Sequence, residues 1–141
     1  MDREAAERLL AEARTAAERA YAPYSGFPVG AAVLTADGTV ITGANIENAS
    51  YSLTICAERV AVFRAVMEGR RAIAAVAIWA ARVRPCPPCG ACRQVLNEWK
   101  PASDEMAVVM EGDEEARITT LSALLPHAFG PHDLAGIDDD A

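Results

Sequence analysis

The chain has 141 residues, of which 52% are hydrophobic and 23% are charged, and its formal net charge at pH 7 is −7. This composition excludes an intrinsically disordered chain, and the length predicts a single domain, residues 1–141, with a substantial core. The acidic balance, without a run of Lys or Arg, argues against a nucleic-acid polymer as partner, because a phosphate backbone requires a clustered basic face.

The first half of the chain predicts a helix followed by a hairpin. Apolar residues recur at three- and four-residue steps over 3–20, which is typical of an amphipathic helix. Residues 29–35 and 39–44 are rich in β-branched and small apolar residues, and they flank Asp37-Gly38. An Asp-Gly pair between two such runs predicts a β-hairpin with its turn at that pair.

The second half alternates between strands and helices. Residues 73–80 form a continuous apolar run, which predicts a central strand that is covered on both faces. The other predicted elements are a helix from 54–56 to Gly69, a helix that starts at Pro88, strands at 105–111 and 116–121, and a short helix over 121–129. This order predicts an α/β fold, a three-layer α/β/α sandwich around one mixed five-stranded sheet.

The sequence also bears on the compartment. The most apolar segment, 72–81, has ten residues and is too short to cross a membrane. The N-terminal segment is charged where a signal peptide would be apolar, so we expect a cytoplasmic protein with no membrane partner. In such a reducing compartment, four cysteines favour a metal or catalytic site over disulfides. The acidic end, 135–141, is expected to be a loose tail.

Three of the four cysteines lie at steps of three residues, at Cys86, Cys89 and Cys92, and the fourth is Cys56. Cys89 and Cys92 lie at the start of a predicted helix, where side chains three apart share one face. Cys56 lies at the start of another helix, and the positive end of a helix dipole favours thiolates. Two helix starts over one sheet can therefore offer zinc three ligands and leave its fourth position open.

Cys86 differs from the other three because it is followed by Pro87-Pro88. A proline disfavours helical backbone at the residue before it, and polyproline geometry separates Cys86 from Cys89 by roughly 9 Å. We therefore expect Cys86 to be surplus. The alternatives that remain are a structural zinc site closed by four cysteines and a thioredoxin-like C-x-x-C pair, and the second is disfavoured because the pair comes late in the chain.

Glu58 favours a catalytic centre, because it follows Cys56 by two residues. A carboxylate beside a metal site can take a proton from water and return it to a leaving group. Taken alone, an acid at this position is more often a first-turn residue that interacts favourably with the helix dipole.

These motifs, CAE at 56–58 and PCGAC at 88–92, resemble those of the small, zinc-dependent cytidine deaminases that act on free nucleosides. The similarity extends over nearly the whole chain, from AYAPYSGFPVGAAVL through GANIENASY to LLPHAFGPHDL. It implies zinc held by Cys56, Cys89 and Cys92, with Glu58 as the catalytic residue. Two departures from the family pattern are Cys86-Pro87 before the second ligand pair and the acidic tail.

The same resemblance implies a set of substrate contacts. By this resemblance, Phe27 would pack on the pyrimidine, Asn45 and Glu47 would hold the ribose hydroxyls, and Ala57 would also contact the substrate. Arg59 hydrogen bonds to the ligand sulfurs and offsets their negative charge. From the residues alone, Phe27 can also be core, Asn45 and Glu47 can terminate a strand, and Arg59 can be an exposed helix arginine.

The resemblance further implies a homotetramer in which neighbouring subunits complete each pocket. The candidates for this role are Tyr51 and Phe129, aromatic residues in segments that are otherwise polar or broken by proline. The alternative is that both side chains pack inside their own subunit.

The predicted activity is zinc-dependent hydrolysis of cytidine and deoxycytidine to the uridines and ammonia, as in pyrimidine salvage. One alternative is a deaminase of another aminopyrimidine nucleoside such as blasticidin S, which Phe27 and the NIEN motif disfavour. The other is a non-catalytic protein with a closed four-cysteine zinc site, which Glu58 disfavours.

Overall fold

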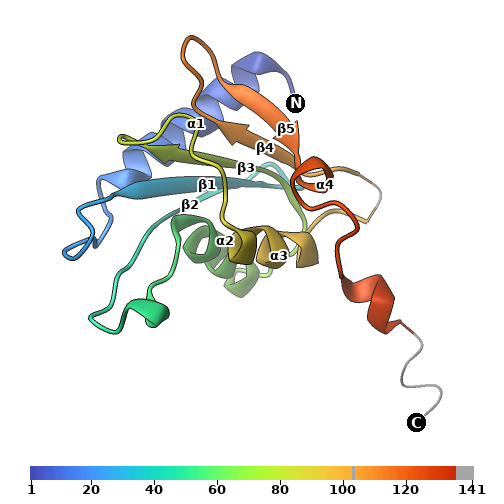
Figure 1. Cartoon of the computed structure of the whole chain (residues 1–141). Coiled ribbons are helices and arrows are strands. Elements are labelled where there is room, and N and C mark those ends of the chain that lie inside the picture. Colours follow the sequence, from blue (N-terminus) through green and yellow to red (C-terminus); the bar gives the residue numbers. More distant parts are fainter. Residues whose placement is uncertain (103, 136–141) are drawn as a thin grey trace.

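A mixed five-stranded sheet forms the centre of the molecule (Figure 1). The computed structural model describes residues 1–102 and 104–135. The strands are β1 (Val29–Thr35), β2 (Val40–Ala44), β3 (Ile73–Ala80), β4 (Ala107–Met110) and β5 (Arg117–Thr120). Their order is β2-β1-β3-β4-β5, in which β3 and β4 are parallel and the other neighbouring pairs are antiparallel.

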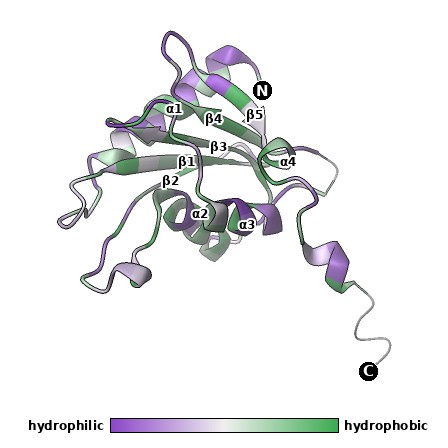
Figure 2. Cartoon of the chain, in the orientation of Figure 1, coloured by the Kyte–Doolittle hydropathy of each residue, from purple (hydrophilic) through white to green (hydrophobic). Residues whose placement is uncertain are grey.

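Helices cover both faces of this sheet. The helices are α1 (Arg3–Ala17), α2 (Ala57–Met67), α3 (Gly90–Glu98) and α4 (Leu121–Leu124), with 3₁₀ turns at Tyr51–Leu53 and Pro131–Leu134. α1 lies on one face, and α2 and α3 lie on the other (Figure 1). Hydrophobic residues concentrate on the strands between these layers (Figure 2). The predicted three-layer α/β/α sandwich is therefore confirmed.

α1 begins where the sequence predicts and ends earlier. The Asp2 carboxylate accepts a hydrogen bond from the Ala5 N–H at 2.8 Å, which caps the N-terminus of the helix. The predicted helix extends to residue 20, but α1 ends at Ala17. The chain must become extended there, because Tyr21 forms a parallel bridge with Ile46. This bridge fixes the start of the loop that follows α1.

The strands agree closely with the sequence pattern. β3 has the predicted bounds, and its residues are mostly buried because β1 and β4 flank it and helices cover it. Gly43 in β2 allows α2 to approach, since a Cβ atom at this position would lie 2.5 Å from the Ala61 nitrogen and 2.6 Å from the Ala57 oxygen. Because Gly43 has no side chain, the first turns of α2 can pack directly against the sheet.

Two further predicted helix bounds are wrong. α3 begins at Gly90 with Cys89 as its N-cap, so Pro88 precedes the helix and does not start it. The predicted helix over 121–129 is reduced to α4, which ends at Leu124. Pro126 disfavours helical backbone at the residue before it, and the chain leaves the body as an arm (Figure 1).

None of the helices within residues 1–102 and 104–135 has the length and apolar composition of a membrane span. The acidic tail expected over 135–141 lies outside the described residues except for Ala135.

Candidate active site

Three cysteine sulfurs meet at the N-termini of two helices. Cys56 is the N-cap of α2, Cys89 is the N-cap of α3, and Cys92 lies in the first turn of α3. The Cys56 and Cys89 sulfurs are 3.9 Å apart, and those of Cys89 and Cys92 are 3.5 Å apart. All three sulfurs lie within 4.8 Å of one another. The helices thus bring together residues that are 33 positions apart in the sequence.

This donor set fits a zinc ion. Sulfur ligands about 2.3 Å from a tetrahedral zinc lie about 3.8 Å from one another, close to the spacings of the three cysteines. Cys89 is exposed and Cys56 is partly exposed, so the centre is accessible from one side. Three protein ligands with an accessible side are typical of catalytic zinc, whereas structural zinc has four protein ligands.

The charge at this centre is concentrated on Cys56. The neighbouring Cys92 thiol lowers the pKa of Cys56 to about 5, and Arg59 also contributes to this lowering. The pKa of Cys92 is raised, because Cys56 holds its proton and because it is buried. The Nη2 of Arg59 lies 3.4 Å from the Cys56 sulfur. The site is therefore suited to bind a cation with thiolate ligands.

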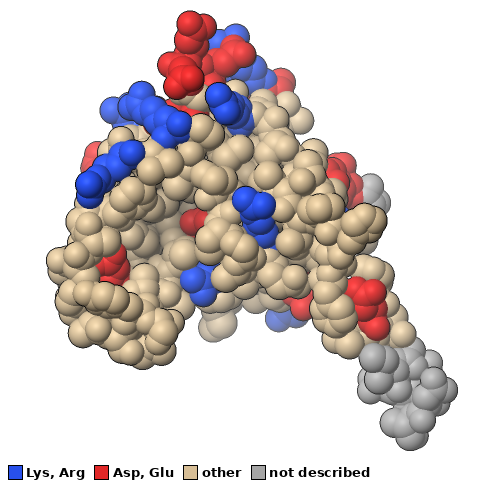
Figure 3. Space-filling view, in the orientation of Figure 1, with Lys and Arg blue, Asp and Glu red and all other residues tan. Residues whose placement is uncertain are grey.

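Glu58 lies in the first turn of α2 and is only 4% exposed. Burial raises the pKa of its carboxyl, and the nearby charge of Cys56 raises it further. On the molecular surface, a hollow over the start of α2 has acidic atoms visible at its floor and basic groups on its rim (Figure 3). A buried acid with a raised pKa beside a metal centre is suited to proton transfer.

Cys86 does not belong to the sulfur cluster. Among the described residues, the group of possible metal ligands at this site contains the other three cysteines and omits Cys86. Its side chain is half-buried and packs against the main hydrophobic core. Burial raises the pKa of the Cys86 thiol to about 11, so the thiol is protonated at neutral pH.

Asn45 joins the end of β2 to the start of β1. Its Oδ1 accepts from the Val29 N–H at 2.9 Å, and its Nδ2 donates to the Phe27 carbonyl at 2.9 Å. The side chain is buried, but one Nδ2 hydrogen is left over from these bonds. Asn45 therefore fixes the backbone on both sides of Pro28 and retains one donor.

Glu47 holds the loop that precedes β1. Its Oε1 accepts from the Tyr24 N–H at 2.9 Å and from the Ser25 N–H at 3.1 Å, and its Oε2 accepts from the Ser25 hydroxyl. These bonds, with Ser25 first, lower the pKa of Glu47. The carboxylate is therefore ionised at neutral pH, and it has lone pairs for further donors.

The remaining predicted site residues lie in different environments. The Ala57 side chain is fully buried in the core, so only its backbone could contact a ligand. Tyr51 is 73% exposed and its ring lies 5.7 Å from that of Tyr24. Phe129 is 59% exposed on the C-terminal arm. Neither Tyr51 nor Phe129 packs in the core of its own chain.

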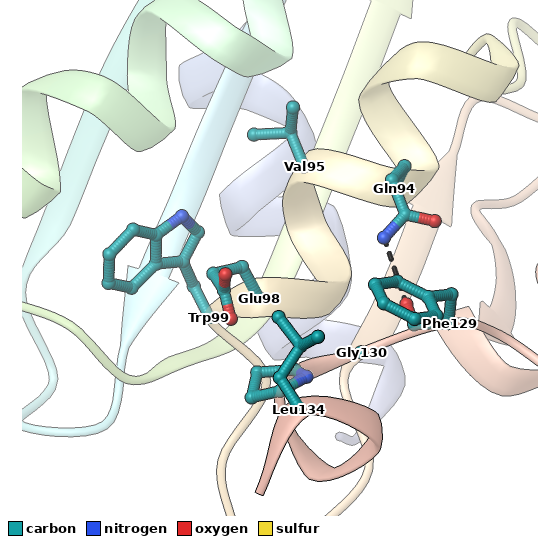
Figure 4. Close-up of a pocket in the computed structure, with 8 residues that line it drawn as sticks. Gln94, Val95, Glu98, Trp99, Phe129, Gly130 and Leu134 are labelled. Carbon is teal, nitrogen blue, oxygen red and sulfur yellow. Dashed lines mark hydrogen bonds between the residues drawn. The ribbon is translucent and has the colours of Figure 1, made fainter. Parts of the chain in front are cut away.

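The arm is held against α3 by its backbone. The amides of Gln94 and Asn97 both donate to the Phe129 carbonyl, at 2.9 and 3.1 Å. A cavity of about 310 Å³ lies between α3 and the arm, and its lining includes Trp99 and Leu134 (Figure 4). None of the cysteines or Glu58 lines this cavity, so it is separate from the metal site.

Sequence reasoning overlooked Arg93, which follows Cys92 directly. Its Nε donates to the Pro88 carbonyl at 2.8 Å, and its Nη1 donates to the Leu124 carbonyl at 2.8 Å. Arg93 therefore connects the turn before Cys89 to the end of α4. The available signal was an arginine one helical turn after Cys89, on the side that carries the ligands.

The fold and the site together define a three-layer α/β/α protein with a three-cysteine zinc centre and a buried acid. The family model described as the cytidine and deoxycytidylate deaminase zinc-binding region matches residues 3–110. The chain belongs to this family.

Known proteins support the assignment over most of the chain. A cytidine deaminase of Halalkalibacterium halodurans is 53% identical over 135 residues, which cover 95% of this chain and 98% of that protein. A cytidine deaminase of Mycobacterium tuberculosis is 44% identical over 126 residues, which cover 89% of this chain and 90% of that protein. The crystal structure of the Burkholderia pseudomallei cytidine deaminase matches with a TM-score of 0.80 and 45% identity, covering 92% of this chain and 100% of that one.

Proposed function

We propose that residues 1–141 act as a single-domain cytidine deaminase that hydrolyses cytidine and deoxycytidine to uridine and deoxyuridine with release of ammonia. The observation that carries this proposal is the buried Glu58 two residues from Cys56, at a centre of three clustered cysteines. A structural zinc site has no need of a buried acid, and burying a carboxyl group costs free energy, so the buried Glu58 favours a catalytic site. Cys56, Cys89 and Cys92 would hold the zinc.

The chemistry is a hydrolysis in which Glu58 moves the protons. When bound, zinc supplies the Lewis acidity that lets water attack at neutral pH. Glu58 takes a proton from the attacking water and delivers it to N3 of the pyrimidine, which makes C4 more electrophilic. After attack at C4, Glu58 takes the proton of the new C4 hydroxyl and delivers it to the amino group, which leaves as ammonia while the C4 carbonyl forms. Water and cytidine are thus converted to uridine and ammonia.

The surroundings of Glu58 suit this role. A base works best when its pKa lies near the working pH, and burial raises the pKa of Glu58 toward that range. Three thiolates donate negative charge to a bound zinc and weaken its acidity. The guanidinium of Arg59, 3.4 Å from the Cys56 sulfur, withdraws part of that charge.

We assign the substrate contacts from the described side chains. The half-buried Phe27 offers an aromatic surface on which a pyrimidine can pack. Asn45 has one amide hydrogen left to donate, and the ionised Glu47 has lone pairs left to accept. Together they complement a pair of ribose hydroxyls. We also assign the backbone of Ala57, which lies between Cys56 and Glu58, as a substrate contact.

We propose a homotetramer in which neighbouring subunits share active sites. Phe129 and Tyr51 are too exposed to belong to the hydrophobic core of their own subunit. The arm that carries Phe129 extends from the body (Figure 1). Further exposed apolar side chains lie along the segment from β2 through α2, at Ile46, Leu53, Phe63 and Met67. A symmetric interface would cover these surfaces and exclude water from the reaction.

A free-nucleoside deaminase fits pyrimidine salvage in the cytoplasm. The three clustered cysteines must stay reduced to bind metal, which favours a reducing compartment. The net charge of −7 disfavours a polynucleotide substrate.

The test incubates the purified protein with cytidine or deoxycytidine, follows ammonia release and the conversion to uridine, and measures zinc in the same sample. We expect about one zinc per chain and turnover of both nucleosides. Turnover of blasticidin S without turnover of cytidine would favour the other nucleoside class. Bound zinc with no turnover of any of these substrates would favour a structural protein, and full activity without metal would contradict the proposal.

A further inference from the structure

The loop over residues 21–28 is held next to the metal site from one side by the segment after β2. Tyr21 N–H donates to the Asn45 carbonyl at 2.9 Å, and Glu47 N–H donates to the Tyr21 carbonyl at 2.8 Å. Between these bonds, Ile46 and Ile55 exchange two backbone hydrogen bonds of 3.0 Å. Ile55 directly precedes Cys56, so this side of the loop is tied to the first cysteine ligand.

Arg82 holds the same loop from the other side. It lies in the segment between β3 and Cys89, and its Nη1 donates to the Gly26 carbonyl at 3.3 Å. Its guanidinium carbon also lies 5.8 Å from the centre of the Phe27 ring. A guanidinium within about 6 Å of an aromatic ring is attracted by the electron-rich face. Arg82 therefore connects the loop to the segment that leads to the second cysteine ligand.

The backbone and the ring of Phe27 are held by different groups. The Phe27 N–H donates to the Ser25 hydroxyl at 3.0 Å, and its carbonyl accepts from the Asn45 amide. These bonds fix the backbone, but they leave the side chain free to rotate about its own bonds. The guanidinium of Arg82 is the charged group that packs against the ring.

We propose that Arg82 is a positioning residue, which clamps loop 21–28 and holds the Phe27 ring in place to receive an aromatic base. This inference rests on the proposed function, since it assigns the base to a nucleoside substrate. If the Phe27 ring is already ordered before the ligand binds, the binding free energy no longer includes the entropy cost of ordering the ring. Without Arg82, a smaller fraction of the molecules has the Phe27 ring in the binding position. The apparent Kd for the nucleoside rises in inverse proportion to that fraction.

Arg84 provides a matched control for Arg82. It lies two residues further along the same segment and is also exposed, but its Nε pairs with the Glu111 carboxylate at 3.2 Å. Arg82→Gln and Arg84→Gln remove the same charge from the same segment. Only the first of them removes a contact with loop 21–28.

Steady-state kinetics of the zinc-loaded protein with cytidine test the proposal. We expect Arg82→Gln to raise KM about three- to tenfold, with kcat within about twofold of wild type and zinc content unchanged. Arg82→Lys keeps a cation that can approach the ring and should lie between Arg82→Gln and wild type. Arg84→Gln should match wild type. Equal KM values for Arg82→Gln and Arg84→Gln, or a loss of zinc from Arg82→Gln, would overturn the proposal.

Amide hydrogen exchange without substrate separates this proposal from the proposed function. The N–H groups of Tyr24, Ser25, Gly26 and Phe27 all have acceptors within the loop or on Glu47. These amides should exchange several times faster in Arg82→Gln and remain unchanged in Arg84→Gln. A wild-type protein without deaminase activity would refute the function and leave this readout intact, whereas unchanged exchange in Arg82→Gln would refute the clamp.

Discussion

The Nε of Arg93 donates a hydrogen bond of 2.8 Å to the backbone carbonyl of Pro88, the residue immediately before the ligand Cys89. Because Nη1 of the same guanidinium binds the Leu124 carbonyl, Arg93 fixes the ligand turn against the end of α4. A lysine has a single ammonium group and cannot keep both bonds in this forked arrangement.

We therefore expect Arg93→Lys to weaken zinc binding by about 10- to 100-fold, as is typical when a group that supports a metal ligand is lost. Competition with a chelator, read as zinc retained per chain, measures this effect. Arg71→Lys, at an exposed position after α2, is the matched control and should bind zinc as wild type does. Equal retention in the two variants would show that the ligand turn is stable without Arg93.

Cys86 and Cys89 should respond differently to the same substitution. Cys89→Ser removes a sulfur that lies 3.5 Å from Cys92, so it should strip zinc and lower the stability of the fold. Cys86→Ser changes a half-buried thiol outside the sulfur cluster and should leave zinc content unchanged. The zinc content of the two purified variants tests this prediction. Equal loss of zinc from both would indicate that all four cysteines bind the metal.

Replacement of Glu58 by Gln should separate chemistry from structure. The amide has nearly the same shape but cannot carry the proton, so we expect kcat to fall by at least about 10²-fold with zinc and fold retained. Measurements of kcat, zinc content and thermal unfolding check this outcome. Glu68→Gln, at an exposed position directly after α2, is the control. A Glu58→Gln variant that keeps about a tenth of wild-type activity would show that another group transfers the proton.

Mixed assemblies test whether Phe129 acts across a subunit interface. Glu58→Gln and Phe129→Ala are each expected to be inactive. After dissociation and joint reassembly, some sites would combine an intact Glu58 with an intact Phe129 from a neighbour, and activity should return. Glu58→Gln reassembled with itself is the control.

Failure to recover activity, with subunit exchange confirmed and the Phe129→Ala parent inactive, would place Phe129 in the site of its own chain. Recovery would instead explain why an aromatic side chain that is 59% exposed lies on an arm away from the core.

The elements set by local sequence could be predicted well. The apolar run of β3 has the predicted bounds, and the Asp-Gly hairpin pairs β1 with β2 as expected, with Gly38 at a φ of 88°. Hydrophobic periodicity and turn chemistry act over a few residues, so the sequence expresses them directly. The same locality explains why the spacing of Cys89 and Cys92 on one helix start indicated a metal site.

Tertiary structure decided the features that depend on contacts between distant segments. α1 ends before its periodic pattern does, because Tyr21 must pair with Ile46. Glu47 and Ser25, 22 residues apart, hold the loop that carries Phe27, and no local pattern in either segment indicates this pairing.

The directions of the arginine side chains also follow from the folded packing. Arg59, Arg82 and Arg93 have long flexible side chains, and a sequence does not reveal which carbonyl, ring or sulfur lies within their reach. Residue types and spacing thus determined which groups could bind zinc and move a proton. The assembly of two helix starts against one sheet determined where those groups meet and what holds them there.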